Sequence, residues 1–234
     1  MRDAADGGVG GERRQEWHGI GGAVLFAGVA LMGVLVRAQK YVADPANRAE
    51  YAAAWGVAPE SLSLEKGLMV TEIVKEGSPV RGMYVMGENP AMSDPDVQHA
   101  REALAHLECL VVQDIFLTET AWHADVVLPA SAHAEKWGTF TNTNRQVQIA
   151  RPVIDPPGEA RQDWALIQQL AQGIGLKWNY THASEVFTEM AEVMPSLKNI
   201  TWERLVREDA VTYPCDAPDQ PGNEIIFATS FPTA

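Results

Sequence analysis

The sequence has few cysteines and few basic residues for its length. Only Cys109 and Cys215 are present, and two cysteines cannot build a disulfide framework, a zinc ribbon or an iron–sulfur ligand set. We therefore expect a reducing compartment and place the chain in the cytoplasm. Lysine and arginine number 18 against 31 acidic residues, which gives a net charge of −13. Because so acidic a chain offers no wide basic face, we expect no nucleic-acid partner.

Long uncharged runs are also scarce. One stretch, Gly19–Val36, extends for eighteen residues without a charge, and its length alone makes it a membrane-spanning candidate. Five of these residues are glycine, which weakens a helix, and no signal-peptide cleavage site follows. We assign residues 1–39 to a leader that is either disordered or a membrane anchor. Membrane contact is expected only through residues 19–36.

From Lys40 onward the pattern is that of a globular protein, in which short apolar runs alternate with helical spacing. Glycine or proline bounds these runs, as expected for buried strands. The predicted strands are Gly82–Met86, Leu110–Val112 and Asp125–Leu128, with one helix that Ser93 or Asp94 caps and another around Thr118–Ala124. Strands and helices joined by short links predict an α/β domain, a parallel three-layer sheet arrangement with short crossover helices.

The segments on either side of this centre are predicted to be mostly helical. The expected elements are helices at Ala43–Trp55, Leu64–Lys75, Arg161–Ile174, Ser184–Met194 and Trp202–Glu208, and an irregular hairpin at Phe140–Ala150. The tail from Tyr213 is rich in proline and aspartate, so we expect it to run over the surface. We divide the globular part into an α/β domain at residues 40–175 and a helical segment with an extended tail at residues 176–234.

Polar side chains gather where the three predicted strands end. In an open parallel sheet, ligands bind outside the carboxyl ends of the strands. These ends are Gly87-Glu88-Asn89-Pro90, Gln113-Asp114 and Pro129-Ala130-Ser131, and Lys136 follows shortly after. Bared backbone, an amide, carboxylates and a hydroxyl suit a purine-like or pterin-like ring and a ribose better than a bare phosphate. The alternatives stay open that Asn89 is an ordinary turn, Asp114 a helix cap and Lys136 a solvated side chain.

Other reactive side chains form no recognisable site. The histidines are scattered without the spacing of a metal site, and we expect His99 and His106 to be solvated helix positions. Ser131 lies outside a nucleophile elbow and has no obvious base, which argues against nucleophilic catalysis. Cys109 begins a predicted buried strand, where a small apolar residue is expected.

Five ordered motifs resemble the large subunits of formate dehydrogenases, in the molybdopterin oxidoreductase superfamily. They are Met83–Asp96 with its Gly-Glu-Asn-Pro loop, Val111–Ala121, Ala124–Pro129, Glu135–Asn142 and Pro157–Trp164. The resemblance covers the chain from Tyr41 to its C-terminus and does not include the leader. Within the superfamily it favours formate dehydrogenase, most like the soluble NAD-linked type.

The resemblance implies a bis(molybdopterin guanine dinucleotide) cofactor carrying molybdenum or tungsten, with this region holding one of its two halves. The implied partners are the NAD- or flavin-binding and iron–sulfur subunits of such an enzyme. Matched residue by residue, the implied cofactor contacts are Gly87, Glu88, Asn89, Gln113, Asp114, Lys136 and Asp163.

The family's catalytic parts do not fall within the matching region. Its iron–sulfur cysteines, its Cys or selenocysteine metal ligand and the adjacent histidine lie upstream, and its C-terminal cofactor-binding barrel lies downstream. We therefore expect a fragment that binds part of the cofactor, contains no catalytic residue and does not turn over formate alone. The alternatives are another molybdopterin oxidoreductase, such as a nitrate reductase, or a non-catalytic interaction protein derived from the family.

Overall fold

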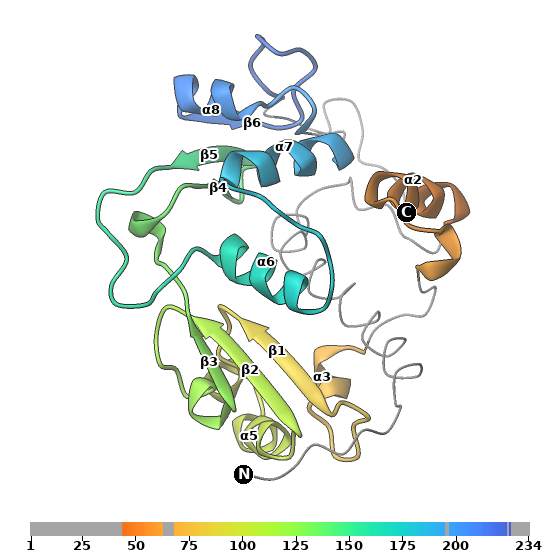
Figure 1. The fold of residues 1–234 in the computed structure, drawn as a ribbon, viewed down its shortest axis with the longest axis vertical. Coiled ribbons are helices and arrows are strands. Elements are labelled where there is room, and N and C mark those ends of the chain that lie inside the picture. The colour runs from red at the N-terminus through yellow and green to blue at the C-terminus, as the bar shows by residue number, and fades with distance from the viewer. Residues whose placement is uncertain (1–43, 63–67, 195–196, 224, 226–234) are drawn as a thin grey trace. The chain divides into compact units, whose positions relative to one another are not determined.

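The computed structural model describes residues 44–62, 68–194, 197–223 and 225 (Figure 1). The leader and its membrane-spanning candidate at Gly19–Val36 lie outside these residues. Contacts divide the chain into two units, Met1–Glu65 and Lys66–Ala234. Within the described ranges, no helix is long and apolar enough to cross a membrane. The predicted domain boundaries stay predictions.

The described part of the first unit is helix α2, Pro45–Trp55, followed by the 3-10 turn η1, Pro59–Ser61. The Asp44 carboxylate accepts a hydrogen bond of 2.8 Å from the Ala46 amide, which starts the helix. Gly56 ends it with a φ of 64°, a left-handed conformation that glycine adopts without strain. The helix predicted at Ala43–Trp55 is therefore present.

The second unit contains the predicted parallel sheet. Its strands are β1, Gly82–Met86, β2, Cys109–Asp114, and β3, Val126–Pro129, in the order β1-β2-β3. Both strand pairs are parallel, and the register sets Val85 beside Val112 and Val112 beside Val127. The prediction of an α/β fold around a parallel sheet is confirmed.

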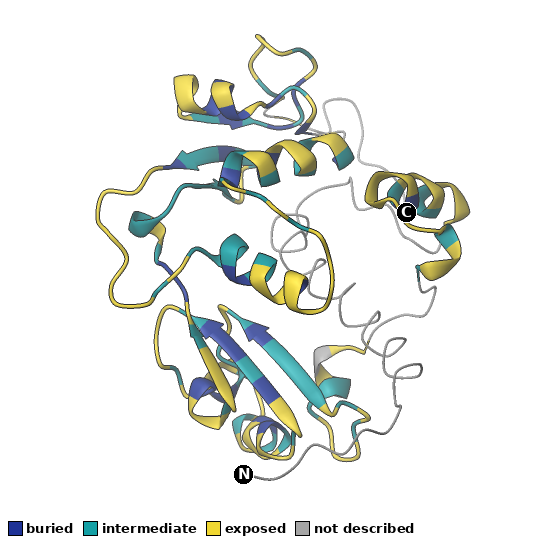
Figure 2. Cartoon of the chain, viewed as in Figure 1, coloured by how far each residue is buried: buried dark blue, intermediate teal, exposed yellow. Residues whose placement is uncertain are grey.

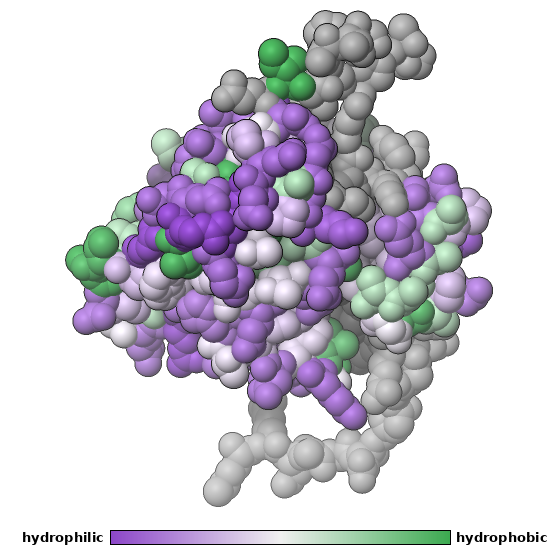
Figure 3. Space-filling view, turned by 90° about the horizontal axis from the view of Figure 1, so that it is seen from above, coloured by the Kyte–Doolittle hydropathy of each residue, from purple (hydrophilic) through white to green (hydrophobic). Residues whose placement is uncertain are grey.

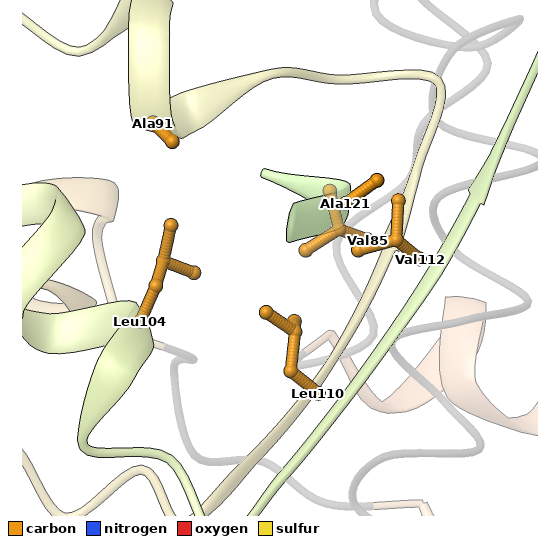
Figure 4. Close-up of a cluster of buried hydrophobic side chains, with 6 residues drawn as sticks. All are labelled: Val85, Ala91, Leu104, Leu110, Val112 and Ala121. Carbon is orange, nitrogen blue, oxygen red and sulfur yellow. The ribbon is translucent and has the colours of Figure 1, made fainter. Parts of the chain in front are cut away.

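Helices cover one face of this sheet. They are α4, Pro90–Ser93, α5, Val97–Ala105, and the 3-10 turn η2, Ala121–His123. Successive strand residues point to opposite faces, so Val85 and Val112 share the face that packs against Leu104 of α5. The buried cluster comprises Val85, Ala91, Leu104, Leu110, Val112 and Ala121 (Figure 4). Each fully buried aliphatic side chain contributes about 1.5–3 kcal/mol, so this cluster is the main support of the sheet.

Three local predictions were wrong at this end of the unit. Helix α5 starts at Val97 because the Asp96 carboxylate accepts from the His99 amide at 3.2 Å, so Asp96 caps it in place of Ser93 or Asp94. Of the helix predicted at Leu64–Lys75, residues 64–67 lie outside the described part of the chain, and within that part helix α3, Val70–Ile73, ends before Lys75. Cys109 is exposed, because it lies at the first position of β2 and on the face opposite to Leu110, whose side chain packs under the helices.

A second, antiparallel sheet follows the first along the chain. After the 3-10 turn η3, His133–Glu135, come β4, Gly138–Thr141, and β5, Gln146–Ala150, which form the predicted hairpin. Strand β6, Ala210–Thr212, pairs with β5 from the far end of the chain.

The predicted surface tail was wrong for the residues that follow β6. Tyr213 is 2% exposed and Cys215 6%, so both are buried. The Tyr213 amide donates to the Arg145 carbonyl at 3.1 Å, and the Arg145 guanidinium donates to the Tyr213 carbonyl at 2.6 Å. These two bonds extend the pairing of β5 and β6 past Thr212 and hold the chain against the sheet.

The remaining helices are α6, Asp163–Gly173, α7, Ala183–Val193, and α8, Trp202–Glu208. All three were predicted, with ends that differ by one or two residues at most. Trp202 joins α8 to α7 by an edge contact of 6.1 Å with Phe187, and it stacks edge-on against His182 at 5.4 Å. Seen from the end where α7 and α8 lie, the described surface is mostly hydrophilic (Figure 3).

Helix α8 also carries a buried arginine, whose guanidinium is hydrogen-bonded to its own helix and to the segments before and after it. Arg204 is 5% exposed. Its guanidinium donates to the Glu208 carboxylate at 3.0 Å, the Asn199 carbonyl at 3.2 Å, the Cys215 Sγ at 3.2 Å and the Gln220 carbonyl at 2.7 Å. We refer to these five residues as the Arg204 group. It fastens residues 215–220 to α8.

Candidate cofactor site

The three loops that follow β1, β2 and β3 meet at one edge of the parallel sheet. The Gly87 amide donates to the Gln113 carbonyl at 2.9 Å, and the Ala130 amide donates to the Asp114 carbonyl at 3.0 Å. Adjacent parallel strands thus bring their carboxyl ends together, as the sequence predicts. Buried residues concentrate in β2, the central strand of this sheet (Figure 2).

A short bridge brings the start of α6 to the same edge. Ala130 pairs with Arg161 in parallel fashion, and the Ser131 amide donates to the Arg161 carbonyl at 2.8 Å. Asp163, two residues later, opens α6, where the positive end of a helix favours a carboxylate. The link explains how a residue fifty positions after Gln113 reaches it.

Four side chains form a continuous hydrogen-bonded chain at this edge, which we call the Lys136 group: Tyr84, Gln113, Asp163 and Lys136. The Tyr84 hydroxyl donates to Gln113 Oε1, and Gln113 Nε2 donates to Asp163 Oδ1 at 2.7 Å. The Lys136 ammonium pairs with the other oxygen of Asp163 and donates to the Ser131 carbonyl at 2.9 Å. The structure therefore joins three of the predicted site residues, Gln113, Lys136 and Asp163, in one group.

The members of this group differ in how far they are exposed to solvent. Gln113 has no exposed surface, whereas the side chains of Lys136 and Asp163 are 17% and 33% exposed. A molecule at the sheet edge would therefore meet Asp163 and Lys136 first. Gln113 supports the carboxylate from below, and a direct contact between Gln113 and a cofactor stays a prediction.

Tyr84 is a member of the group that the sequence analysis missed. Burial, and secondarily the negative charge of Asp163, raise the pKa of Tyr84 to about 12. The phenol therefore stays a hydrogen-bond donor at neutral pH, and it holds the Gln113 amide with its nitrogen toward Asp163. The signal was available in the strand register, because Tyr84 lies beside Val111 and so shares a sheet face with Gln113.

Ser131 is a second residue that the site reasoning undervalued. It has no exposed surface, and its Oγ finds no hydrogen-bond partner among the described residues. A buried polar atom without a partner costs about 1–3 kcal/mol, so such atoms are rare in folded proteins and call for a physical reason. A hydroxyl left open beside a lysine–aspartate pair fits a site that receives polar atoms from another molecule.

Asn89 and Thr120 form a separate hydrogen-bonded pair, which we call the Asn89 bracket, and it holds the loop that follows β1. Asn89 Oδ1 accepts from the Thr120 amide at 3.1 Å and from its hydroxyl at 2.8 Å. Asn89 Nδ2 donates to the Glu119 carboxylate at 2.7 Å, and this bond lowers the pKa of Glu119. The Thr120 hydroxyl in turn accepts from the Ala91 amide at 3.0 Å. The amide of Asn89 is thus used in shaping the loop.

The other predicted site residues lie at the same edge. Apart from the backbone bond from the Gly87 amide to the Gln113 carbonyl, no hydrogen bond joins them to the Lys136 group in the described contacts. Gly87 turns the chain with a φ of 61°. Glu88 Oε1 accepts from the Ser93 hydroxyl at 2.9 Å, and Asp114 Oδ1 accepts from the Phe116 amide at 3.1 Å. Each carboxylate keeps one oxygen outside these bonds, so both remain able to accept from a ligand.

The side chains at this edge could hydrogen-bond a heterocycle. A carboxylate can accept two parallel N–H donors, and a neighbouring ammonium can donate to a carbonyl oxygen on the same ring. Within the described part of the chain, no three His, Cys, Asp or Glu side chains are grouped so as to hold a metal ion.

Comparison with known proteins gives a consistent assignment. A family model described as molybdopterin oxidoreductase matches residues 11–173, starting upstream of Tyr41, where the resemblance noted from the sequence begins. The chain is 47% identical over 175 residues to the F420-dependent formate dehydrogenase subunit alpha of Methanocaldococcus jannaschii, covering 74% of this chain and 26% of that protein. It is 46% identical over 189 residues to the F420-dependent formate dehydrogenase 1 subunit alpha of Methanococcus maripaludis, covering 80% of this chain and 27% of that protein.

The chain thus spans about a quarter of the length of the curated relatives that it matches. Their names give F420, whereas the sequence resemblance favours the NAD-linked type, so the electron acceptor stays a prediction. Among solved structures, acetylene hydratase from Pelobacter acetylenicus matches with a TM-score of 0.52 and 20% identity, covering 74% of this chain and 25% of that one. That likeness supports the fold.

Proposed function

This chain belongs to the molybdopterin oxidoreductase family, and we propose that it supplies part of the cofactor site of a formate dehydrogenase large subunit. The ligand we propose is one guanine dinucleotide half of a bis(molybdopterin guanine dinucleotide) carrying molybdenum or tungsten. One observation carries the proposal: the Lys136 group joins Gln113, Lys136 and Asp163 at the carboxyl ends of the parallel strands. When bound, the cofactor supplies the metal centre that takes two electrons from formate.

The role of each side chain follows from its place in the group. Asp163 accepts N–H donors from the guanine or pterin edge, because its carboxylate is the exposed end of the group. Lys136 donates to a carbonyl or phosphate oxygen of the same molecule and pairs with Asp163. Gln113 fixes the Asp163 carboxylate from beneath, and Tyr84 fixes Gln113.

The remaining predicted contacts complete the proposed site. Asp114 and Glu88 each offer a free carboxylate oxygen, and Gly87 bares its backbone at the turn. Asn89 contributes by shaping the first loop, with its carbonyl oxygen and amide nitrogen already bonded. We further propose that the chain works in the cytoplasm with the NAD- or flavin-binding and iron–sulfur subunits of the enzyme.

The test is the binding of guanosine diphosphate (GDP) to the full chain, measured by nuclear magnetic resonance titration with adenosine diphosphate as the competing purine. We expect GDP to bind more tightly, because a carboxylate with an adjacent ammonium matches the guanine edge. Asp163→Ala, Lys136→Ala and Asp114→Ala should each weaken GDP binding by about tenfold or more. His99→Ala and His106→Ala serve as controls, because both lie away from this edge on α5 and its end.

Two results would overturn the proposal. The first is equal binding of the two purines, and the second is the same GDP affinity in the Asp163 and Lys136 variants as in the histidine controls. Another molybdopterin oxidoreductase, such as a nitrate reductase, would share this cofactor site. A non-catalytic interaction protein would instead show no GDP binding at all.

A further inference from the structure

The Ser131 hydroxyl is a buried polar group of the second unit that has no hydrogen-bond partner among the described residues. Its residue has no exposed surface, and Oγ forms no hydrogen bond within the described part of the molecule. Sequence resemblance assigned it no role, and its position excludes a nucleophile elbow. Its surroundings are therefore the only guide to what it does.

The backbone of Ser131 is fixed on both sides. Its carbonyl accepts from the Lys136 ammonium at 2.9 Å, and its amide donates to the Arg161 carbonyl at 2.8 Å. These bonds fix the residue beside the lysine–aspartate pair. The hydroxyl therefore belongs to the same residue whose carbonyl binds the Lys136 ammonium, which the proposed ligand would approach.

Thr120 offers a direct comparison. It is as fully buried as Ser131 and follows the neighbouring strand β2 by a few residues. Its hydroxyl donates to Asn89 Oδ1 at 2.8 Å and accepts from the Ala91 amide at 3.0 Å. The fold thus satisfies one buried hydroxyl at this edge completely and leaves the other open.

We infer that the Ser131 hydroxyl is a ligand-binding group of this site, donating a hydrogen bond to an acceptor oxygen of the bound dinucleotide. The inference rests on the proposed function. The acceptor is an oxygen that Lys136 also approaches, either the guanine carbonyl or a phosphate oxygen. Binding would give the Ser131 hydroxyl a hydrogen-bond partner, and the ligand would gain a buried contact at the edge of the parallel sheet.

The inference predicts effects of opposite sign on folding and on binding. Ser131→Ala removes the unpaired hydroxyl, so the ligand-free chain should melt about 2–4 °C higher than the wild type. Thr120→Val, which keeps the shape but removes two hydrogen bonds, should melt lower. Differential scanning calorimetry of the three full chains measures both changes. A lower melting temperature for Ser131→Ala would show that the hydroxyl has a partner in the folded chain and would overturn the inference.

Binding is the second arm. Ser131→Ala should weaken GDP binding about fivefold, the loss expected for one neutral hydrogen bond. Titrations with guanosine and with pyrophosphate locate the acceptor: a loss for guanosine places it on the base, and a loss for pyrophosphate places it on the phosphates. If Asp163→Ala weakens GDP binding and Ser131→Ala leaves it unchanged, this inference is wrong and the proposed function stands. If the wild type binds no GDP, both fail.

Discussion

Lys136 and Arg204 are both largely buried cations, yet the polar groups around them differ in how completely they are hydrogen-bonded within the chain. The Arg204 group is closed within the chain, since its guanidinium donates to two carbonyls, a thiol and a carboxylate of α8 and the segments next to it. The Lys136 group runs from the partly buried Tyr84 to the part-exposed carboxylate of Asp163, and the Ser131 hydroxyl beside it has no partner among the described residues.

The difference separates polar groups that stabilise the fold from those that serve a site. A buried cation that is hydrogen-bonded within the chain stabilises the fold, because protein acceptors replace the water molecules that it loses on burial. An incompletely bonded group lowers stability and keeps capacity for another molecule. The contrast can be tested by changing one member of each group at a time.

The largest effect on folding is expected at the closed group. Arg204→Ala leaves the Asn199 and Gln220 carbonyls and the Cys215 thiol without their donor, so the free energy of unfolding should fall by about 3 kcal/mol. Denaturant unfolding measures it, and GDP binding should be unchanged. Arg207→Ala is the matched control, because Arg207 contacts the same Glu208 but is 61% exposed. Equal losses for the two variants would mean that the group is not a stability centre.

The next effect is expected on binding. Asp163→Asn keeps the shape of the side chain but removes the charge that faces Lys136. GDP affinity should fall by about tenfold or more, with a smaller change in the denaturation midpoint. Isothermal titration calorimetry gives the first and urea unfolding the second. A variant that unfolds readily but binds GDP normally would place Asp163 with Arg204 as a folding residue.

A smaller change is expected at the Asn89 bracket. Asn89→Ala leaves the Thr120 hydroxyl and amide without their acceptor, which should cost about 1–2 kcal/mol of unfolding free energy. GDP binding should weaken less than in Asp163→Asn. Paired denaturation and titration of the two variants compare the roles. A normal melting temperature with a large loss of GDP affinity would instead make Asn89 a direct contact.

The smallest effect is a dependence on alkaline pH. Folding raises the pKa of Tyr84 from its ordinary value near 10 to about 12, so the protonated phenol is favoured in the folded state. Its contribution to stability is complete below pH 10 and disappears as the pH rises toward 12. Tyr84→Phe should therefore lose less stability over this range, as followed by urea unfolding at each pH. An identical pH profile would show that the phenol is not linked to folding.

Much of this site could be predicted from the sequence because its signals are local. Glycine and proline bound the strand at Gly82–Met86, whose predicted limits are those observed. Parallel strands place their ends together, so Gln113 and Asp114 lie at the predicted edge. Helical spacing likewise predicted the helix at Trp202–Glu208 with the limits observed. These features depend on the spacing of apolar residues along the chain and on the glycine and proline residues that bound the helices and strands.

The rest depends on contacts between distant residues. The three residues of β6 are too few to show a strand period, and they become a strand by pairing with β5. The unpaired state of Ser131 is a property of its neighbours, and no residue pattern carries it. Tyr84 could have been placed on the Gln113 face only after the register of β1 and β2 was known.

The pairing of β5 with β6 has a consequence for the order of events during synthesis. The β4–β5 hairpin can close as soon as it leaves the ribosome, because its strands are neighbours in sequence. The other edge of β5 must wait until Ala210–Thr212 has been made, some sixty residues later. Throughout that interval the nascent chain presents an open strand edge, the kind of surface that templates aggregation or recruits chaperones.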